Sequence, residues 1–135
     1  MQLEVITRGE ASDPARPSLL FIHGGFHGAW CWDEFVLPWF AARGWHANAL
    51  SLRGHGTSDG REGMSRWTLN DFVDDVSQVL GQIARPTVLV GHSIGGVIAQ
   101  RNWERDKNVA GMILYASSPL RPDAAVVMRL LRTRP

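Results

Sequence analysis

Apolar residues along the chain follow two patterns: short continuous runs, and longer stretches in which they recur every three or four residues. Continuous runs favour buried strands, and the three-to-four spacing favours helices. Together with flanking Gly and Pro, these patterns predict strands at 3–7, 18–22, 45–52, 86–90 and 109–116, and helices at 38–43, 68–83, 94–105 and 122–132. From residue 18 onward strands and helices alternate, which predicts an α/β fold with a mostly parallel sheet and helices on both faces.

The stretch from 68 to 83 has the clearest helical period. Its apolar residues fall on one face: Leu69, Phe72, Val73, Val76, Val79, Leu80 and Ile83. Thr68, followed three residues later by Asp71, is typical of a capped helix start. The shorter helix is expected to begin at Pro38 and to end before Gly44, because proline favours the first helical position and glycine the position just after the last.

Ser93 stands in the sequence Gly91-His92-Ser93-Ile94-Gly95, between a predicted strand and a predicted helix. Only a very sharp turn fits there, and glycines two residues either side of the serine remove side chains that would collide in it. Such a turn presents the hydroxyl above the carboxyl ends of the strands, where open α/β sheets bind ligands. This context favours Ser93 as a catalytic nucleophile. The alternative is that the short pattern arises by chance and Ser93 only caps a helix.

A second glycine-rich segment, HGGFHGAW at 23–30, follows the strand at 18–22. Acyl transfer needs N–H donors aimed at the oxygen of the tetrahedral intermediate, and glycines let the backbone approach it closely. We expect the N–H groups of Gly25 and Ile94 to form this oxyanion hole, with Phe26 a less favoured replacement for Gly25. Phe26, His27 and Trp30 are candidates for lining the substrate pocket. The alternative is that the segment is only a connector.

Four motifs carry a resemblance to a known family: HGGFHGAW, SLRGHGTSDG at 51–60, GHSIGG at 91–96 and MILYASSP at 112–119. In their order and spacing, the chain resembles the amino-terminal half of an α/β-hydrolase fold enzyme of the esterase or lysophospholipase-like kind. The resemblance covers residues 1–135 and implies part of a single domain, a truncated fold without its last strands. It also implies that a cap or lid region starts at about 120–135.

In the resembled family the catalytic acid and histidine follow the nucleophile along the chain. All five histidines here, His23, His27, His46, His55 and His92, precede Ser93. We expect none of them to be the base, and we expect His27 and His55 to be hydrogen-bonded loop residues. Asp123 is expected to be a helix-start residue rather than the acid. Because losing the histidine of a triad costs about a millionfold in turnover, we interpret the chain as a nearly inactive fragment.

The expected function is therefore that of a serine hydrolase of the carboxylic-ester type, acting on a small hydrophobic ester or acyl substrate. Two alternatives stay open. One is a non-catalytic protein that uses the same pocket to hold a small hydrophobic ligand. The other is related chemistry on the same scaffold: acyl transfer, carbon–carbon bond hydrolysis or perhydrolysis. None of these reactions requires a metal or an organic cofactor.

Composition limits the class of protein, the compartment and the partners that we expect. The 135 residues are 44% hydrophobic and 20% charged with a net charge of +1, which predicts a globular protein and argues against a nucleic-acid partner. The single cysteine forms no internal disulfide and no cysteine-based metal site, and no signal peptide or membrane span is recognisable, so we expect a cytoplasmic protein. As partners we expect a complementing carboxy-terminal half, or a second copy pairing through an exposed sheet edge at 109–116.

Overall fold

A five-stranded sheet in the order β1-β3-β2-β4-β5 forms the centre of the computed structural model, which describes residues 1–117. The strands are β1 Val5–Arg8, β2 Ser18–Ile22, β3 Ala47–Leu50, β4 Thr87–His92 and β5 Val109–Tyr115. β2, β3, β4 and β5 are paired in parallel, and only β1 runs antiparallel to its neighbour β3. The predicted mostly parallel sheet is confirmed.

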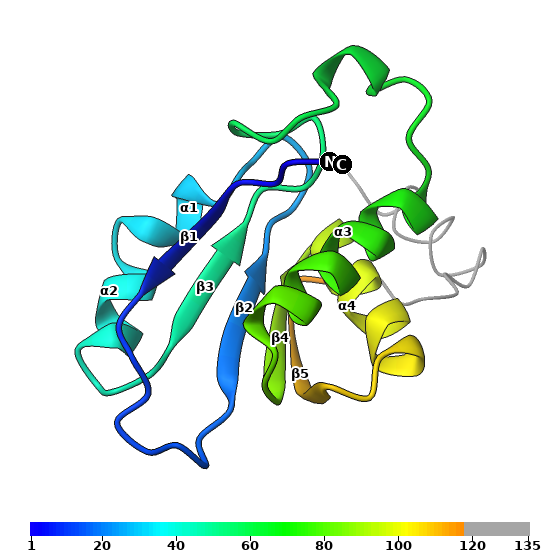
Figure 1. Cartoon of the computed structure of the whole chain (residues 1–135). Helices are drawn as coiled ribbons and strands as arrows, with labels where there is room; N and C mark the ends of the chain where they lie inside the picture. The colour runs from blue at the N-terminus through cyan, green and yellow to red at the C-terminus, as the bar shows by residue number, and fades with distance from the viewer. Residues whose placement is uncertain (118–135) are drawn as a thin grey trace, which may run out of the picture.

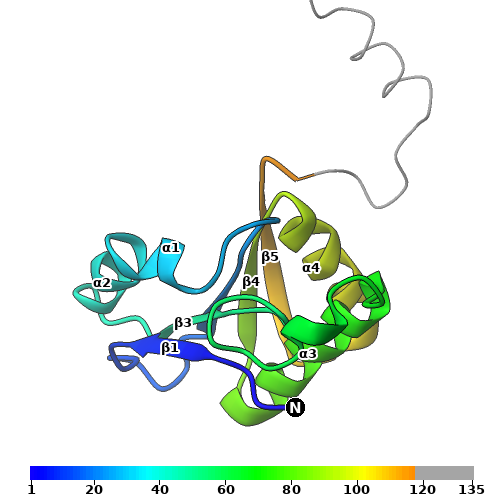
Figure 2. The same cartoon turned by 90° about the horizontal axis from the view of Figure 1, so that it is seen from above.

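Helices cover both faces of this sheet, as predicted. The helices are α1 Trp30–Asp33, α2 Val36–Ala41, α3 Leu69–Ile83 and α4 Ile94–Arg105, with one 3-10 turn, η1 Arg61–Gly63. Figure 2 shows α1 and α2 on one face and α3 and α4 on the other. In Figure 1, β2 and β4 lie at the centre, with α1 and α2 at the left and α3 and α4 at the right.

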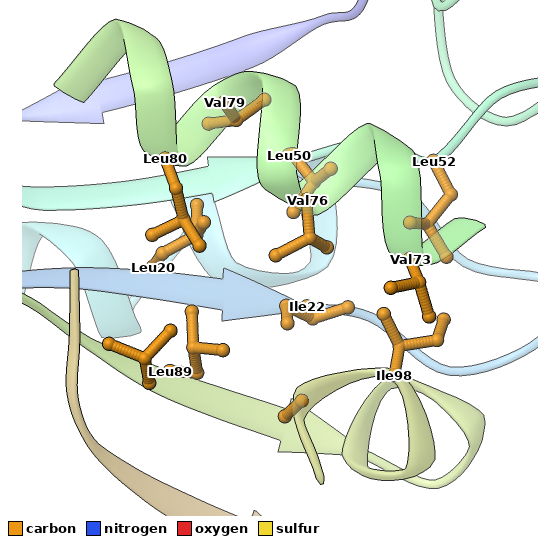
Figure 3. Close-up of a cluster of buried hydrophobic side chains, with 12 residues drawn as sticks. Leu20, Ile22, Leu50, Leu52, Val73, Val76, Val79, Leu80, Leu89 and Ile98 are labelled. Carbon is orange, nitrogen blue, oxygen red and sulfur yellow. The ribbon is translucent and has the colours of Figure 1, made fainter. Parts of the chain in front are cut away.

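The larger core lies between α3, α4 and the sheet. Val73, Val76 and Leu80 of α3 point toward Leu20 and Ile22 of β2 (Figure 3), and all five side chains are buried. The helix starts where the sequence predicts, because the Thr68 hydroxyl accepts from the Asp71 N–H and the Asp71 carboxylate accepts from the Thr68 N–H. This reciprocal capping satisfies two donors that the first turn leaves without partners.

A smaller core lies on the opposite face, under α1 and α2. The Phe21 ring packs against Trp32 and Phe40, with ring centroids 5.1 and 5.7 Å apart. Burial of aromatic rings contributes a large part of the apolar area that such a layer removes from water. The two short helices are therefore held on the sheet by these aromatic contacts together with the buried Leu37.

The helices over this smaller core differ in their bounds from the predicted ones. α2 starts at Val36, two residues before the predicted start at Pro38. Pro38 is still tolerated because it lies in the first turn, where no N–H has an intrahelical partner. The four-residue α1 was not predicted, since a single turn is too short to show a period. The predicted helix 122–132, Asp123 and the predicted cap at 120–135 lie outside the described residues.

β5 occupies one edge of the sheet formed by residues 1–117, as the sequence predicts. Its residues Met112, Ile113, Leu114 and Tyr115 are all exposed, and no residue of the strand is charged. An uncharged apolar edge strand is a surface on which another strand can pair. Pairing with a second copy or with a complementing segment stays a prediction.

A buried ion pair ties α3 to the loop after β3. Arg53 contacts Asp75 at 2.7 Å and Asp71 at 3.0 Å, and the Asp75 side chain is only 1% exposed. Asp75 also accepts a hydrogen bond of 2.9 Å from the Arg53 N–H. The carboxylate thus fixes both the backbone and the side chain of Arg53.

We expect Asp75→Ala to lower the free energy of unfolding by about 3–5 kcal/mol, because it leaves the Arg53 guanidinium without its buried partner. Urea unfolding followed by circular dichroism measures the change. Asp74→Ala is the matched control: Asp74 pairs with Arg105 at the surface and its side chain is 57% exposed, so its loss should cost less than about 1 kcal/mol. Equal losses in the two variants would contradict this account of the loop.

Candidate functional site

Ser93 is the single residue between β4 and α4. The strand ends at His92, the helix begins at Ile94, and Ser93 itself has φ 54° and ψ −119°. A positive φ is strained for a residue with a side chain and is tolerated where the surroundings fix it. Ser93 is half-buried rather than sealed in the core.

Glycines allow the backbone segments around Ser93 to touch. A Cβ added at Gly91 would lie 2.5 Å from the carbonyl oxygen of Gly95 and 2.5 Å from the Cα of Gly96. A Cβ at Gly95 would overlap the Ile22 carbonyl oxygen and lie 2.6 Å from that of His23. The predicted sharp turn is therefore present, and it packs α4 directly on the end of β2.

The loop after β2 passes close to the junction of β4 and α4 (Figure 2). A Cβ added at Gly24 would lie 3.2 Å from the Cβ of Ser93. In this loop the Gly25 N–H donates no hydrogen bond to another group of residues 1–117. Ile94 is the first residue of α4, so its N–H has no partner within the helix. Gly25 and Ile94 thus each carry an N–H without a hydrogen-bond partner in residues 1–117, one in the loop after β2 and one at the start of α4.

Both residues also line an apolar cavity of about 200 Å³. Its walls come from four separate parts of the chain: Gly24, Gly25, Phe26, Leu52, His55, Met64, Phe72 and Ile94. A neighbouring cavity of about 430 Å³ brings together the three predicted pocket residues Phe26, His27 and Trp30. Sequence reasoning did not identify Met64 and Phe72, because residues so far from Ser93 along the chain carry no local signal of their position.

His23 anchors the start of the loop after β2. Its ring is fully buried, and its Nδ1 lies 2.7 Å from the Gly24 carbonyl oxygen, while the Leu52 N–H donates to its Nε2 at 3.0 Å. These partners assign the proton to Nδ1, which donates to the carbonyl. Burial lowers the pKa of His23 to about 4, so the ring is neutral at pH 7.

The other histidines have partners away from Ser93. The Nδ1 of His27 lies 2.8 Å from the Gly25 carbonyl oxygen, and that of His55 lies 3.1 Å from the Arg53 carbonyl oxygen. The His92 ring packs on Tyr115, with centroids 5.4 Å apart. Among residues 1–117 no hydrogen bond joins a histidine to Ser93. The expectation that His27 and His55 are hydrogen-bonded loop residues is confirmed.

Residues 1–117 contain no cluster of three or more His, Cys, Asp or Glu side chains arranged to hold a metal ion. Within the same residues, no helix has the length and apolar character needed to cross a membrane.

Comparison with known proteins places the chain among hydrolases. The model of the alpha/beta hydrolase family matches residues 19–135. Protein phosphatase methylesterase 1 of Bos taurus is 38% identical over 86 residues, which span 62% of this chain and 23% of that protein. Esterase PIR7B of Oryza sativa subsp. japonica is 32% identical over 115 residues, which span 82% of this chain and 42% of that protein.

Solved structures show the same likeness. The thioesterase domain from the curacin biosynthetic pathway superposes with a TM-score of 0.74 and 28% identity, over 96% of this chain and 47% of that domain. The chain thus spans less than half the length of each of these three proteins.

We expect Gly91→Ala to lower the free energy of unfolding by about 2–3 kcal/mol, because the new methyl group overlaps backbone atoms that have no room to move. Gly81→Ala is the control. Gly81 lies on α3, and a Cβ there would meet nothing within 4 Å, so this change should raise stability by about 0.5–1 kcal/mol. Urea unfolding measures both. A loss of stability in both variants, or in neither, would contradict the close packing described at Ser93.

The buried neutral ring of His23 predicts a pH dependence. Between the ordinary histidine pKa of 6.5 and its folded value of about 4, the unfolded chain binds a proton that the folded chain excludes. Stability therefore falls as pH drops through this window, by up to about 3 kcal/mol. Burial also lowers the pKa of His46, so His23→Gln should flatten the profile in part. An unchanged slope in His23→Gln would contradict the assignment.

Proposed function

The chain belongs to the alpha/beta hydrolase family, and we propose that it is built for acyl transfer from carboxylic esters through Ser93. In this proposal the Ser93 hydroxyl oxygen attacks the ester carbonyl carbon, and the N–H groups of Gly25 and Ile94 stabilise the oxyanion that forms. The alcohol leaves, and water then releases the acid. The proposal is supported by Ser93 standing at the sharp turn between β4 and α4, and by one apolar cavity that is lined by both Gly25 and Ile94, whose N–H groups donate no hydrogen bond within residues 1–117.

The acyl part of the substrate is proposed to occupy the cavity of about 200 Å³ next to Gly25 and Ile94. Its lining contains no Asp, Glu, Lys or Arg side chain, so it suits a small hydrophobic group. The methylesterase and esterase among the relatives support an ester as the substrate class.

Attack by Ser93 requires that its hydroxyl proton be removed. A serine hydroxyl is a poor nucleophile until a base removes its proton, and the chain has no histidine after Ser93. Catalysis without the histidine of a triad falls by about a millionfold. The 135-residue chain by itself is therefore proposed to acylate slowly.

A second candidate function is the binding of a small hydrophobic ligand without catalysis. It is favoured by one observation: within residues 1–117 the Ser93 hydroxyl has no hydrogen bond to a histidine. The two candidates differ in whether Ser93 forms a covalent bond, so trapping of an adduct separates them.

A fluorophosphonate probe, incubated with the protein for hours and followed by intact mass, tests the proposal. We expect slow addition of one adduct to the wild-type chain and none to Ser93→Ala, because the phosphonyl group reacts with the serine that the oxyanion hole faces. Ser65→Ala, which removes an exposed serine of another loop, should react like the wild type. Equal labelling of Ser93→Ala and wild type, or no labelling of either, would leave ligand binding as the function.

A further inference from the structure

The loop after β2 has a strained backbone. Phe26, next to Gly25, has φ 64°, and its side chain is fully exposed. A bulky residue in this left-handed region persists only where contacts outside it fix the backbone. Since the Phe26 side chain contacts little, the anchors must lie at the two ends of the loop. His23 holds the first end, through Gly24 and Leu52.

A chain of hydrogen bonds holds the second end. The Ala29 N–H donates to the Ser51 hydroxyl oxygen at 2.8 Å, and the Ser51 hydroxyl donates to the Glu4 carboxylate. The Thr57 N–H donates to the same Glu4 oxygen at 3.2 Å. Because a hydroxyl has one proton, its donation to Glu4 leaves the oxygen lone pairs free to accept from Ala29. One carboxylate thus sets the orientation of Ser51.

The hydrogen bonds that join Ala29, Ser51 and Glu4 are closely surrounded by other parts of the protein. Ser51 is fully buried. A Cβ at Gly28 would lie 3.0 Å from the Ser51 hydroxyl oxygen, and a Cβ at Gly56 would overlap both that oxygen and the Glu4 carboxylate. Partial burial favours the neutral acid, but the hydrogen bonds from Ser51 and Thr57 outweigh it and lower the pKa of Glu4 below its ordinary value. Glu4 is therefore an ionised acceptor at pH 7.

We propose that Glu4 and Ser51 are positioning residues for the reaction at Ser93. Through Ala29 they fix the loop in the conformation that places the Gly25 N–H beside Ser93. The inference rests on the proposed function, in which the Gly25 N–H belongs to the oxyanion hole. Neither residue lines the cavity next to Gly25 and Ile94, so both act through the loop.

The test compares the rate of Ser93 phosphonylation in Ser51→Ala, Glu4→Leu and Glu4→Gln with that of the wild type. Ser51→Ala and Glu4→Leu should slow labelling by about tenfold to a hundredfold, because a donor displaced by about 1 Å loses most of its effect. Glu4→Gln keeps an acceptor for Ser51 and should restore most of the rate. A purely structural role would lower stability and leave the labelling rate of the folded protein unchanged.

Glu10→Leu is the matched control, since Glu10 is an exposed carboxylate with no hydrogen bond in residues 1–117. It should label at the wild-type rate. If Ser51→Ala does not fold, the pair Glu4→Leu and Glu4→Gln carries the comparison. Wild-type rates in both Ser51→Ala and Glu4→Leu would overturn the positioning role and leave the proposed function standing. Absence of labelling in the wild type would overturn the proposed function.

Amide chemical shifts give a readout that does not need the reaction. In the unlabelled protein, Ser51→Ala and Glu4→Leu should move the amide signals of both Ala29 and Gly25, while Glu4→Gln and Glu10→Leu should leave Gly25 close to its wild-type position. A change confined to Ala29, with Gly25 unmoved, would overturn the proposal even where Ser93 reacts.

Discussion

Direct contact between backbones at the junction of β4 and α4 is the constraint on which the site depends. Gly91 lies against Gly95 and Gly96, and Gly95 lies against the carbonyl groups that end β2. No residue with a Cβ fits these contacts without movement. Because the contacts are made, α4 starts immediately beyond the strand, Ser93 is left at the bend, and the first N–H of the helix is placed at the end of β2.

The site also depends on the order of the strands in the sheet. β2 and β4 are parallel neighbours, with Ile22 paired to Gly91, so their carboxyl ends meet at one edge. The loop that follows β2 and the turn that follows β4 must therefore lie side by side, although about seventy residues separate them in the sequence. His23, buried at the start of that loop, then fixes its direction through two hydrogen bonds. Strand order thus brings Ser93 and the loop that carries Gly25 to the same edge of the sheet.

Much of this arrangement could be predicted from the sequence, because its signals are local. The run at 18–22, the period at 68–83 and the glycines around Ser93 each specify an element or a turn within a few residues. Other features could not be predicted. The single turn of α1 has no period, the antiparallel direction of β1 follows from pairing with β3, and the cavity residue Met64 lies in a loop. The contact between Glu4 and Ser51 joins residues 47 positions apart, and neither residue type indicates from the sequence that it has such a partner.

Titration of the protein with a phenylboronic acid, followed by amide chemical shifts, tests the central claim most directly. A boronic acid forms a tetrahedral anionic adduct with an accessible serine, and its oxygen imitates the oxyanion of acyl transfer. The amide signals of Gly25 and Ile94 should shift together in the wild-type chain and stay unchanged in Ser93→Ala. Shifts that are the same in both proteins, or an adduct that leaves Gly25 unaffected, would contradict this claim.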